Sequence, residues 1–189
     1  MSYPTTPKFN AVNIESDSPT LFSETVSGRM QSRKIGGQKW RFSASYASLK
    51  RSEFQPVWAF CVAQQGRHGV FSVVPPVISS TSGTASGSVT CSAAAIGDTS
   101  VTISGLTGGL KAGDFVKFAG HTKVYMLTAD RSGNGAVSIE PALISTVSAS
   151  EQLVYNDVPF TVRLANDVQT YDTGVGGIYE YEIDFVEAL

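Results

Sequence analysis

The chain has 189 residues, of which 42% are hydrophobic and 16% charged, and its formal net charge at pH 7 is −2. This composition supports a packed core and excludes a wholly disordered protein. No stretch approaches the roughly 18 apolar residues of a membrane span, and the start MSYPTTPKFNAV has neither the basic nor the apolar region of a signal peptide. We therefore expect a soluble protein made in a cytoplasm, with no membrane anchor.

The charge is distributed unevenly. Residues 1–75 carry nine Lys/Arg and four Asp/Glu, whereas residues 76–189 carry five and twelve. A chain with a basic first part and an acidic second part can attract copies of itself as readily as it can bind a polyanion. Seven of the basic residues lie between Gly28 and Arg51, without a single acid. This run indicates either a solvated surface or an electrostatic contact with another chain.

The first predicted elements are a strand, a basic hairpin and a second strand, over residues 20–49. Gly36 and Gly37, in the connection, tolerate the positive φ that tight hairpins need. The second strand alternates between an apolar face and a polar face, as expected when a sheet buries one side. Its apolar face consists of Trp40, Phe42, Ala44 and Tyr46, and its polar face of Arg41, Ser43 and Ser45.

A helix follows, beginning close to Ser52, because Pro56 is tolerated only near the first turn. Ser52 with Gln55 resembles a capping box, and Gly66 suits the position after the last turn. One apolar stripe predicts that this helix packs on the sheet; the stripe consists of Phe54, Val57, Trp58, Cys61 and Val62. The sequence GVFSVVPP then predicts a returning strand that ends at Pro75 and Pro76.

Short β segments separated by glycine-rich turns fill residues 77–158, which favours a small barrel or sandwich. The predicted strands are GSVTCSA, TSVTISGL, DFVKFAG, KVYMLTA, AVSIEPA and EQLVYND. Two longer strands close the chain, VPFTVRLAND and GGIYEYEIDFVEAL, and in the second of them Glu180, Glu182 and Asp184 alternate with apolar residues. The acidic face of this strand and the basic face of the Trp40–Tyr46 strand suggest pairing, within one subunit or between neighbours.

The predicted fold class is therefore mainly β. Residues 1–76 and 159–189 form a discontinuous α+β domain of β-sheets with one helix, and residues 77–158 form an inserted all-β barrel or sandwich.

Evidence for an enzyme is weak. His121 lies between Asp114 and Asp130, but each of these three residues falls at a predicted turn, where its type is expected for local reasons. The chain has no G-x-S-x-G elbow and no phosphate-binding loop. Two histidines and two distant cysteines, which we expect to be packed thiols, make a zinc site improbable. We expect no catalytic residue, no metal and no cofactor.

The strand KWRFSASYASL, the helix EFQPVWAFCVAQQGRHG, the strand GVFSVVPP and the two closing strands together resemble the distal tail proteins and related minor tail proteins of long-tailed (siphovirus-type) bacteriophages. The segment AGDFVKFAGHTKVYMLTADRSGNGAVSIEPAL looks like the β-barrel module often inserted into phage tail and baseplate proteins. The resemblance implies a structural virion protein at the tail tip. Such proteins form a ring, commonly of six subunits, that joins the tail tube to the tip hub around a channel for DNA.

A closed ring needs two complementary surfaces on each subunit. We hypothesise that the basic hairpin of one subunit meets the acidic closing strand of the next. The candidate residues are Arg29, Arg33, Lys34, Lys39 and Arg41 on one side, and Glu180, Glu182, Asp184 and Glu187 on the other.

Two other functions compete with the ring. The insert could be a carbohydrate- or receptor-binding adhesin, which would need exposed aromatic residues there; the candidates are Tyr125, Tyr155, Phe115 and Phe118, whose alternation favours core packing. The basic hairpin could instead contact nucleic acid phosphates. However, Trp40, Phe42 and Tyr46 share a face more typical of a core than of a base-stacking platform, and we expect no specific nucleic acid binding.

Overall fold

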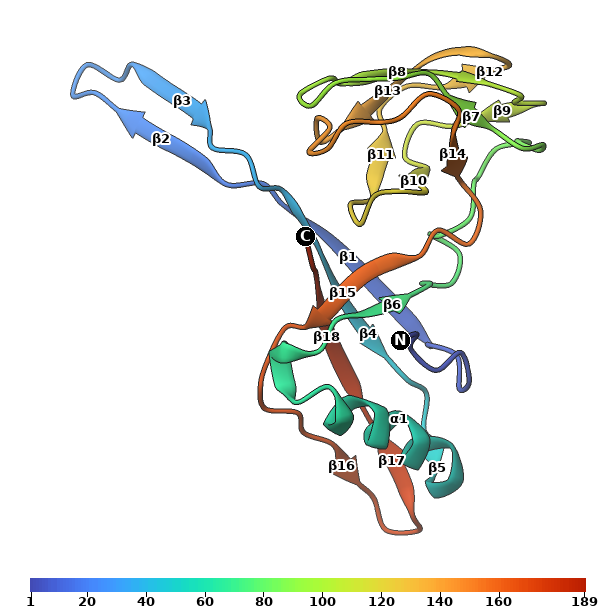
Figure 1. The fold of residues 1–189 in the computed structure, drawn as a ribbon. Helices are drawn as coiled ribbons and strands as arrows, with labels where there is room; N and C mark the ends of the chain where they lie inside the picture. The colour runs from blue at the N-terminus through green and yellow to red at the C-terminus, as the bar shows by residue number, and fades with distance from the viewer.

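The structure, a computed structural model, describes all 189 residues and is mainly β, with one α-helix and one closed barrel (Figure 1). Its central element is a five-stranded antiparallel sheet. In spatial order the strands are β1 (Ala11–Asp17), β4 (Lys39–Ser45), β18 (Glu182–Glu187), β15 (Phe160–Leu164) and β6 (Phe71–Val73). The two ends of the chain therefore contribute neighbouring strands, as the closing strands predict. No helix is both long and apolar enough to span a membrane.

The two alternating strands lie side by side and bury the faces that their patterns predict. Trp40, Phe42, Ala44 and Tyr46 are all buried, as are Tyr181, Ile183 and Phe185 of the last strand. Phe42 of β4 lies opposite Phe185 of β18, so that both strands turn the same side to the core. The period of two in the sequence thus predicts the buried side of the sheet correctly.

A long two-stranded arm extends this sheet away from the body (Figure 1). It consists of β2 (Thr20–Glu24) and β3 (Met30–Lys34), and we refer to residues 20–34 as the arm. The tight turn of the arm lies at Thr25–Arg29, where the Thr25 N–H donates to the Arg29 carbonyl at 3.0 Å. Gly36 and Gly37 have the predicted positive φ but link β3 to β4 instead of forming the turn. The sequence analysis also missed β1, the partner strand of β4.

The predicted helix, α1 (Arg51–Ala63), packs on the buried apolar face of the sheet (Figure 1). Its first turn is held by Glu53, which accepts the Lys50 N–H at 3.0 Å, so the predicted capping pair Ser52 and Gln55 is wrong. Phe54, Val57 and Cys61 are buried as predicted, but Val62 is 58% exposed. The buried face is rotated away from Val62 because Phe60 packs edge-on against Phe71 and Tyr3 of the sheet region.

A short 3₁₀ turn, η1 (Gly66–His68), leads from the helix to β6, which ends just before the predicted Pro pair. Below the main sheet, β5 (Leu49–Lys50), β16 (Asp172–Thr173) and β17 (Ile178–Glu180) form a small three-stranded sheet beside the helix (Figure 1). Both cysteines are free and buried, as predicted.

All six strands predicted between residues 87 and 157 are present, and they close into a barrel. The order around the barrel is β10 (Phe115–Phe118), β11 (Tyr125–Leu127), β13 (Gly135–Glu140), β8 (Ser100–Ser104), β7 (Thr90–Cys91) and β14 (Glu151–Val154). A further pair, β9 (Gly109–Leu110) and β12 (Arg131–Ser132), covers one end.

The molecule has two apolar cores. The barrel core contains 16 buried residues, all between Val89 and Tyr155. The second core contains 20 buried residues from the sheet, the helix and the N-terminal segment. Phe115 and Val124 of the barrel region pack into this second core, so the barrel sits directly against the sheet.

Candidate assembly surface

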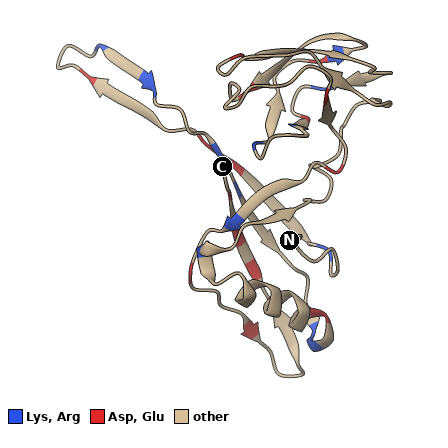
Figure 2. Ribbon diagram, viewed as in Figure 1, with Lys and Arg blue, Asp and Glu red and all other residues tan.

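The arm and the start of β4 offer positive charges that are not paired within the chain. Of the five predicted basic residues, Arg29, Arg33 and Lys39 make no ion pair within the chain. Lys34 pairs with Glu140 of β13, and Arg41 donates from Nε and Nη2 to Asp17 at 3.0 and 2.8 Å. Figure 2 shows the basic residues of the arm standing well apart from the acidic residues of the small sheet. The cations open to a partner are therefore the three unpaired ones.

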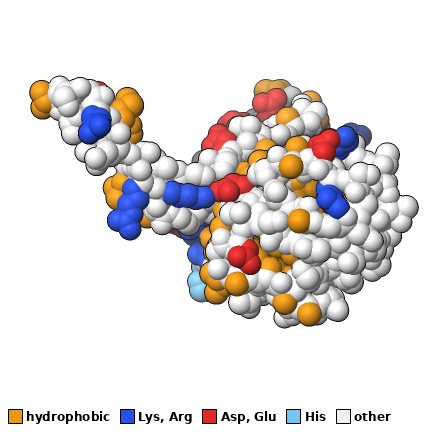
Figure 3. Space-filling view, turned by 90° about the horizontal axis from the view of Figure 1, so that it is seen from above, with side chains coloured by type: hydrophobic (Ala, Val, Ile, Leu, Met, Phe, Trp, Pro, Cys, Tyr) orange, Lys and Arg blue, Asp and Glu red, His pale blue; other side chains and the backbone are white.

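The arm also exposes apolar side chains. Every residue of β2 and β3 is exposed, including Leu21 and Phe22 at 58% each and Met30 at 65%. Leu21 and Phe22 are adjacent on an antiparallel ribbon, so they lie on its opposite faces. Figure 3 shows the arm projecting from the body with hydrophobic and basic side chains side by side. A two-stranded ribbon with no core of its own is marginally stable in water, and exposed apolar clusters mark contact surfaces.

The acidic candidates lie at the other end of the molecule. Glu180 and Glu182 are exposed and Asp184 is half-buried, and none of the three makes an ion pair. Ser43 donates to Glu182 at 2.8 Å, and Asn166 donates to Asp184 at 3.4 Å. Asp172 lies directly opposite Glu180 across β16 and β17, a like-charge pair that disfavours the pairing unless a cation is near. No cation of the chain lies within ion-pair distance of these carboxylates.

The polar face of β4 and the acidic face of β18 lie side by side within one chain. The two strands are neighbours in the same chain, with Ser43 opposite Asp184 and Ser45 opposite Glu182. The predicted pairing of the two strands therefore occurs within one subunit. It brings the polar side chains of β4 to the acidic face, but it leaves Arg29 and Arg33 at the far end of the arm.

Glu187 corrects the predicted acidic surface. Its side chain is buried, with 1% of the residue exposed, so it cannot face a neighbouring subunit. The reason is parity: Ile183, Phe185 and Glu187 are two residues apart and share the core face, whereas Glu180, Glu182 and Asp184 share the other. Residue 187 therefore belongs to the apolar face of the alternating pattern in this strand.

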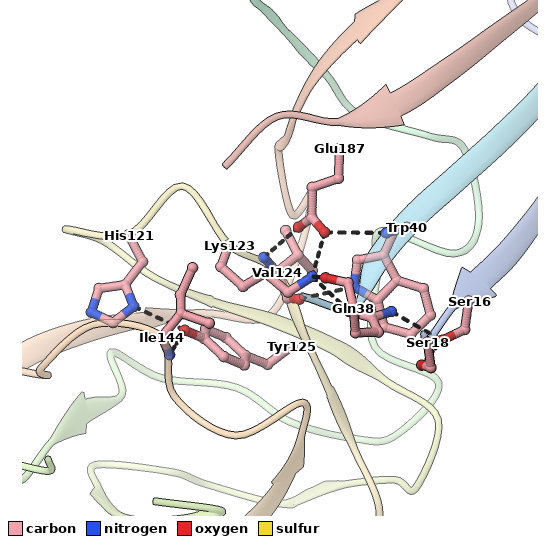
Figure 4. Close-up of polar contacts among 10 residues, drawn as sticks. All are labelled: Ser16, Ser18, Gln38, Trp40, His121, Lys123, Val124, Tyr125, Ile144 and Glu187. Atoms are coloured by element: carbon pink, nitrogen blue, oxygen red, sulfur yellow. Dashed lines mark hydrogen bonds and ion pairs between the residues drawn. The ribbon is translucent and has the colours of Figure 1, made fainter. Parts of the chain in front are cut away.

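The partner of Glu187 is Lys123, which the sequence analysis did not single out. Lys123 follows the turn after β10, and its side chain is fully buried. Its ammonium group pairs with Glu187 Oε2 and donates to Gln38, to the carbonyl at 3.0 Å and to Oε1 at 2.7 Å (Figure 4). Burial lowers the pKa of Lys123, and the Glu187 carboxylate counteracts this effect in part.

Glu187 is equally well satisfied. Its Oε1 accepts the Val124 N–H at 2.9 Å, and its Oε2 accepts the Trp40 N–H at 3.2 Å. The Trp40 indole N–H donates in turn to the Val124 carbonyl at 2.9 Å. No buried side-chain nitrogen or oxygen in the protein lacks a partner. A lysine just before an apolar strand is ordinarily read as exposed, so only the tertiary arrangement reveals this network.

The loop around His121 is structural. His121 is buried, with Nδ1 3.3 Å from the Tyr125 hydroxyl and Nε2 3.2 Å from the Thr146 carbonyl. Asp114 is buried as well and accepts hydrogen bonds from Thr81, Ser82 and Lys111, which fasten the segment leading into the barrel. Asp130 accepts from Lys111 and Ala112. The three residues serve different local contacts and do not converge on one site.

Replacement of Asp114 by Asn is expected to lower the free energy of unfolding by about 1–3 kcal/mol, because the site loses hydrogen bonds to a charged acceptor. Burial by itself raises the pKa of this carboxyl, but the hydrogen bonds from Thr81, Lys111 and Ser82 outweigh it and hold the pKa below its ordinary value of 3.8. The folded state therefore prefers the charged form. The contribution of Asp114 is complete above pH 3.8 and is lost as the pH falls through the lowered pKa.

Urea titrations of both proteins between neutral and acid pH check this prediction. The stability difference between wild type and the Asn variant should shrink below pH 3.8. A difference that is independent of pH would contradict it.

Neither competing function gains support from the geometry. The four aromatic candidates of the insert (Phe115, Phe118, Tyr125 and Tyr155) are all buried, as their alternation predicts. No aromatic platform for a sugar ring remains among them. Trp40, Phe42 and Tyr46 are also buried, which removes the base-stacking surface that single-stranded nucleic acid would need.

The chain is similar in sequence to known phage tail proteins. A family model described as "Distal tail protein pb9, B domain" matches residues 80–158, the stretch that forms the barrel. The distal tail protein pb9 of Escherichia phage T5 is 29% identical over 164 residues, which cover 84% of this chain and 80% of pb9. The predicted resemblance to phage distal tail proteins is confirmed. These matches support a structural protein of a phage tail, and the barrel corresponds to the B domain of that family.

Proposed function

We propose that this protein is a virion component that forms a closed ring, of six subunits by family resemblance, in a bacteriophage tail. The ring joins the tail tube to the proteins of the tail tip and encloses the channel for DNA. Residues 1–76 and 159–189 form the ring domain, and residues 77–158 form a separate module carried by it. The partners are further copies of the chain, the tube protein, and hub and other baseplate proteins. The protein is made in the host cytoplasm and acts without catalysis or cofactor.

The observation that carries this proposal is the arm. It projects from the body with exposed Leu21, Phe22 and Met30 and with unpaired Arg29 and Arg33. The unpaired acids Asp172, Glu180 and Glu182 lie on the opposite side of the molecule (Figure 1). Two complementary surfaces at opposite ends cannot meet within one chain. In the proposed assembly they meet between neighbours, in the head-to-tail arrangement that generates a ring when the rotation between subunits closes.

Charge and apolar area have different roles at this contact. Each exposed ion pair contributes about 0.2–1 kcal/mol, so the charges select the orientation and speed the encounter. The apolar side chains of the arm supply most of the affinity, at roughly 25 cal/mol per Å² removed from water. Assembly should therefore weaken only modestly with salt.

Light scattering tests the ring directly. The molar mass of the purified protein is measured at several concentrations and at two salt levels. A closed oligomer near six subunits supports the proposal, and it should persist at the higher salt. A ladder of sizes that grows with concentration would contradict a closed ring. A protein that stays monomeric, even in the presence of purified tube protein, would contradict the proposed ring.

A further inference from the structure

We propose that the inserted barrel positions the arm: through the buried Lys123–Glu187 pair and the contacts around it, the barrel fixes the direction in which the arm leaves the sheet. The barrel would then be part of the assembly machinery and not only a module carried on the outside. The inference rests on the proposed role of the arm in assembly, but it can be tested without it.

The first contact lies at the base of the arm. Gln38 directly precedes β4, at the point where the chain returns from the arm to the sheet. Both the carbonyl and the side-chain oxygen of Gln38 accept hydrogen bonds from Lys123, and its amide donates to Ser16 of β1 at 3.0 Å. One barrel side chain therefore holds the returning strand of the arm, and through Gln38 it is linked to the outgoing strand.

The second contact is an apolar seam beside this network. The Trp40 ring packs edge-on against Phe115 of β10 with centroids 5.0 Å apart, and Phe115 packs against Phe160 of β15 at 5.4 Å. The Trp40 indole also donates to Val124. Two barrel residues are thus wedged between the root of the arm and the central sheet, which restricts rotation of the barrel about its connections to the sheet.

The third contact lies further out. Lys34, the last residue of β3, pairs with Glu140 at the end of β13. Both side chains are about half exposed, so this pair adds little stability. The pair matters because of where it lies: it links the arm itself to the barrel wall, outside the buried network.

The buried pair is suited to positioning. Removing two charges from water costs about as much as their attraction returns, so such a pair contributes little stability compared with apolar residues of the same size. Its geometric demands are strict, however: all three Lys123 donors and both Glu187 oxygens have partners here, drawn from Gln38, Trp40 and Val124. A displacement of the barrel relative to the sheet would break these contacts and leave buried charges unpaired. The network therefore favours the relative position of barrel, arm root and sheet seen here.

Electron–electron distance measurements between two spin labels test this inference. One label replaces Ser27 in the turn of the arm, and the other replaces Ser145, an exposed barrel residue. Cys61 and Cys91 are buried and stay unlabelled, which the unmutated protein verifies. Labelled protein is diluted with an excess of unlabelled protein so that distances between subunits do not contribute.

The wild type should give one narrow distance distribution. The double variant Lys123→Met/Glu187→Gln should lose the narrow peak and give a broad distribution, with the far-ultraviolet circular dichroism of wild type. The matched control is Lys111→Met/Asp130→Asn, which removes an exposed pair at the far side of the barrel and should leave the peak unchanged. A narrow peak in the folded Lys123 variant overturns the inference.

If the buried double variant loses its cooperative unfolding, Gln38→Ala combined with Lys34→Met decides in its place. This variant removes the side-chain acceptor of Lys123 at the root of the arm, the hydrogen bond to Ser16 and the outer ion pair, and it should broaden the distance distribution. A narrow peak in this variant overturns the inference. The result is independent of the ring. A wild type that is monomeric under all conditions defeats the proposed function, while the distance distribution still decides whether the barrel holds the arm.

Discussion

Replacement of Lys123 by Met alone should lower the free energy of unfolding by about 3–5 kcal/mol, because it leaves the Glu187 carboxylate buried without its cation. Glu187 is 1% exposed and cannot reach water without moving the end of β18. Chemical denaturation followed by tryptophan fluorescence measures the loss. Trp40 lies in the network and reports on it directly.

Two comparisons separate the lost charge from lost packing. Lys123→Met/Glu187→Gln should regain much of the stability, since no buried charge is left unpaired. Lys111→Met serves as a control, because its ammonium group pairs with Asp130 on the exposed surface of the barrel. Equal losses in Lys123→Met and in the double variant would show that the pair itself is unimportant.

The double variant Leu21→Ser/Phe22→Ser should fold normally and fail to assemble. Both side chains are 58% exposed, so the monomer loses little by the change. Burying a leucine and a phenylalanine at a subunit contact contributes about 1.5–3 kcal/mol each, which corresponds to a loss of about 10²–10⁴-fold in the association constant of each contact. Analytical ultracentrifugation over a range of concentrations measures the shift from oligomer to monomer.

Ile96→Ser is the matched control, because Ile96 is 65% exposed on a barrel loop and lies outside the proposed contact. It should assemble as wild type does. If the arm variant assembles at the same concentrations as wild type, the proposed contact is wrong. If both variants fail to assemble, the effect is not specific to the arm.

The sequence alone predicts most elements of this protein, because their signals are local. The alternation from Trp40 to Tyr46, the stripe of Phe54, Val57 and Cys61, and the six short strands of the insert all depend on the geometry of single elements. Where the prediction failed locally, a competing contact is responsible. Phe60 rotates the helix away from Val62, and Glu53 caps it in place of Gln55.

The candidate surface was only partly predictable. The sequence correctly separates a basic hairpin from an acidic strand, since charge can be read along the chain. It could not show that Lys34 and Arg41 are already paired within the chain, with partners 106 and 24 residues away. The alternation in the sequence does place Glu187 on the core face of its strand. Because the neighbouring acids Glu180, Glu182 and Asp184 lie on the other face, Glu187 is easily assigned to that face with them.

The type of fold follows from local signals in the sequence: the apolar periods, the glycine-rich turns and the order of strand, helix and insert. The way in which the parts are joined depends on contacts between residues far apart in the chain. Lys123 and Glu187 are 64 residues apart, and Lys123 carries no local sign of burial. They meet because the turn after β10 and the end of β18 are brought to the root of the arm, and a buried charge is tolerated only where the fold supplies its partner.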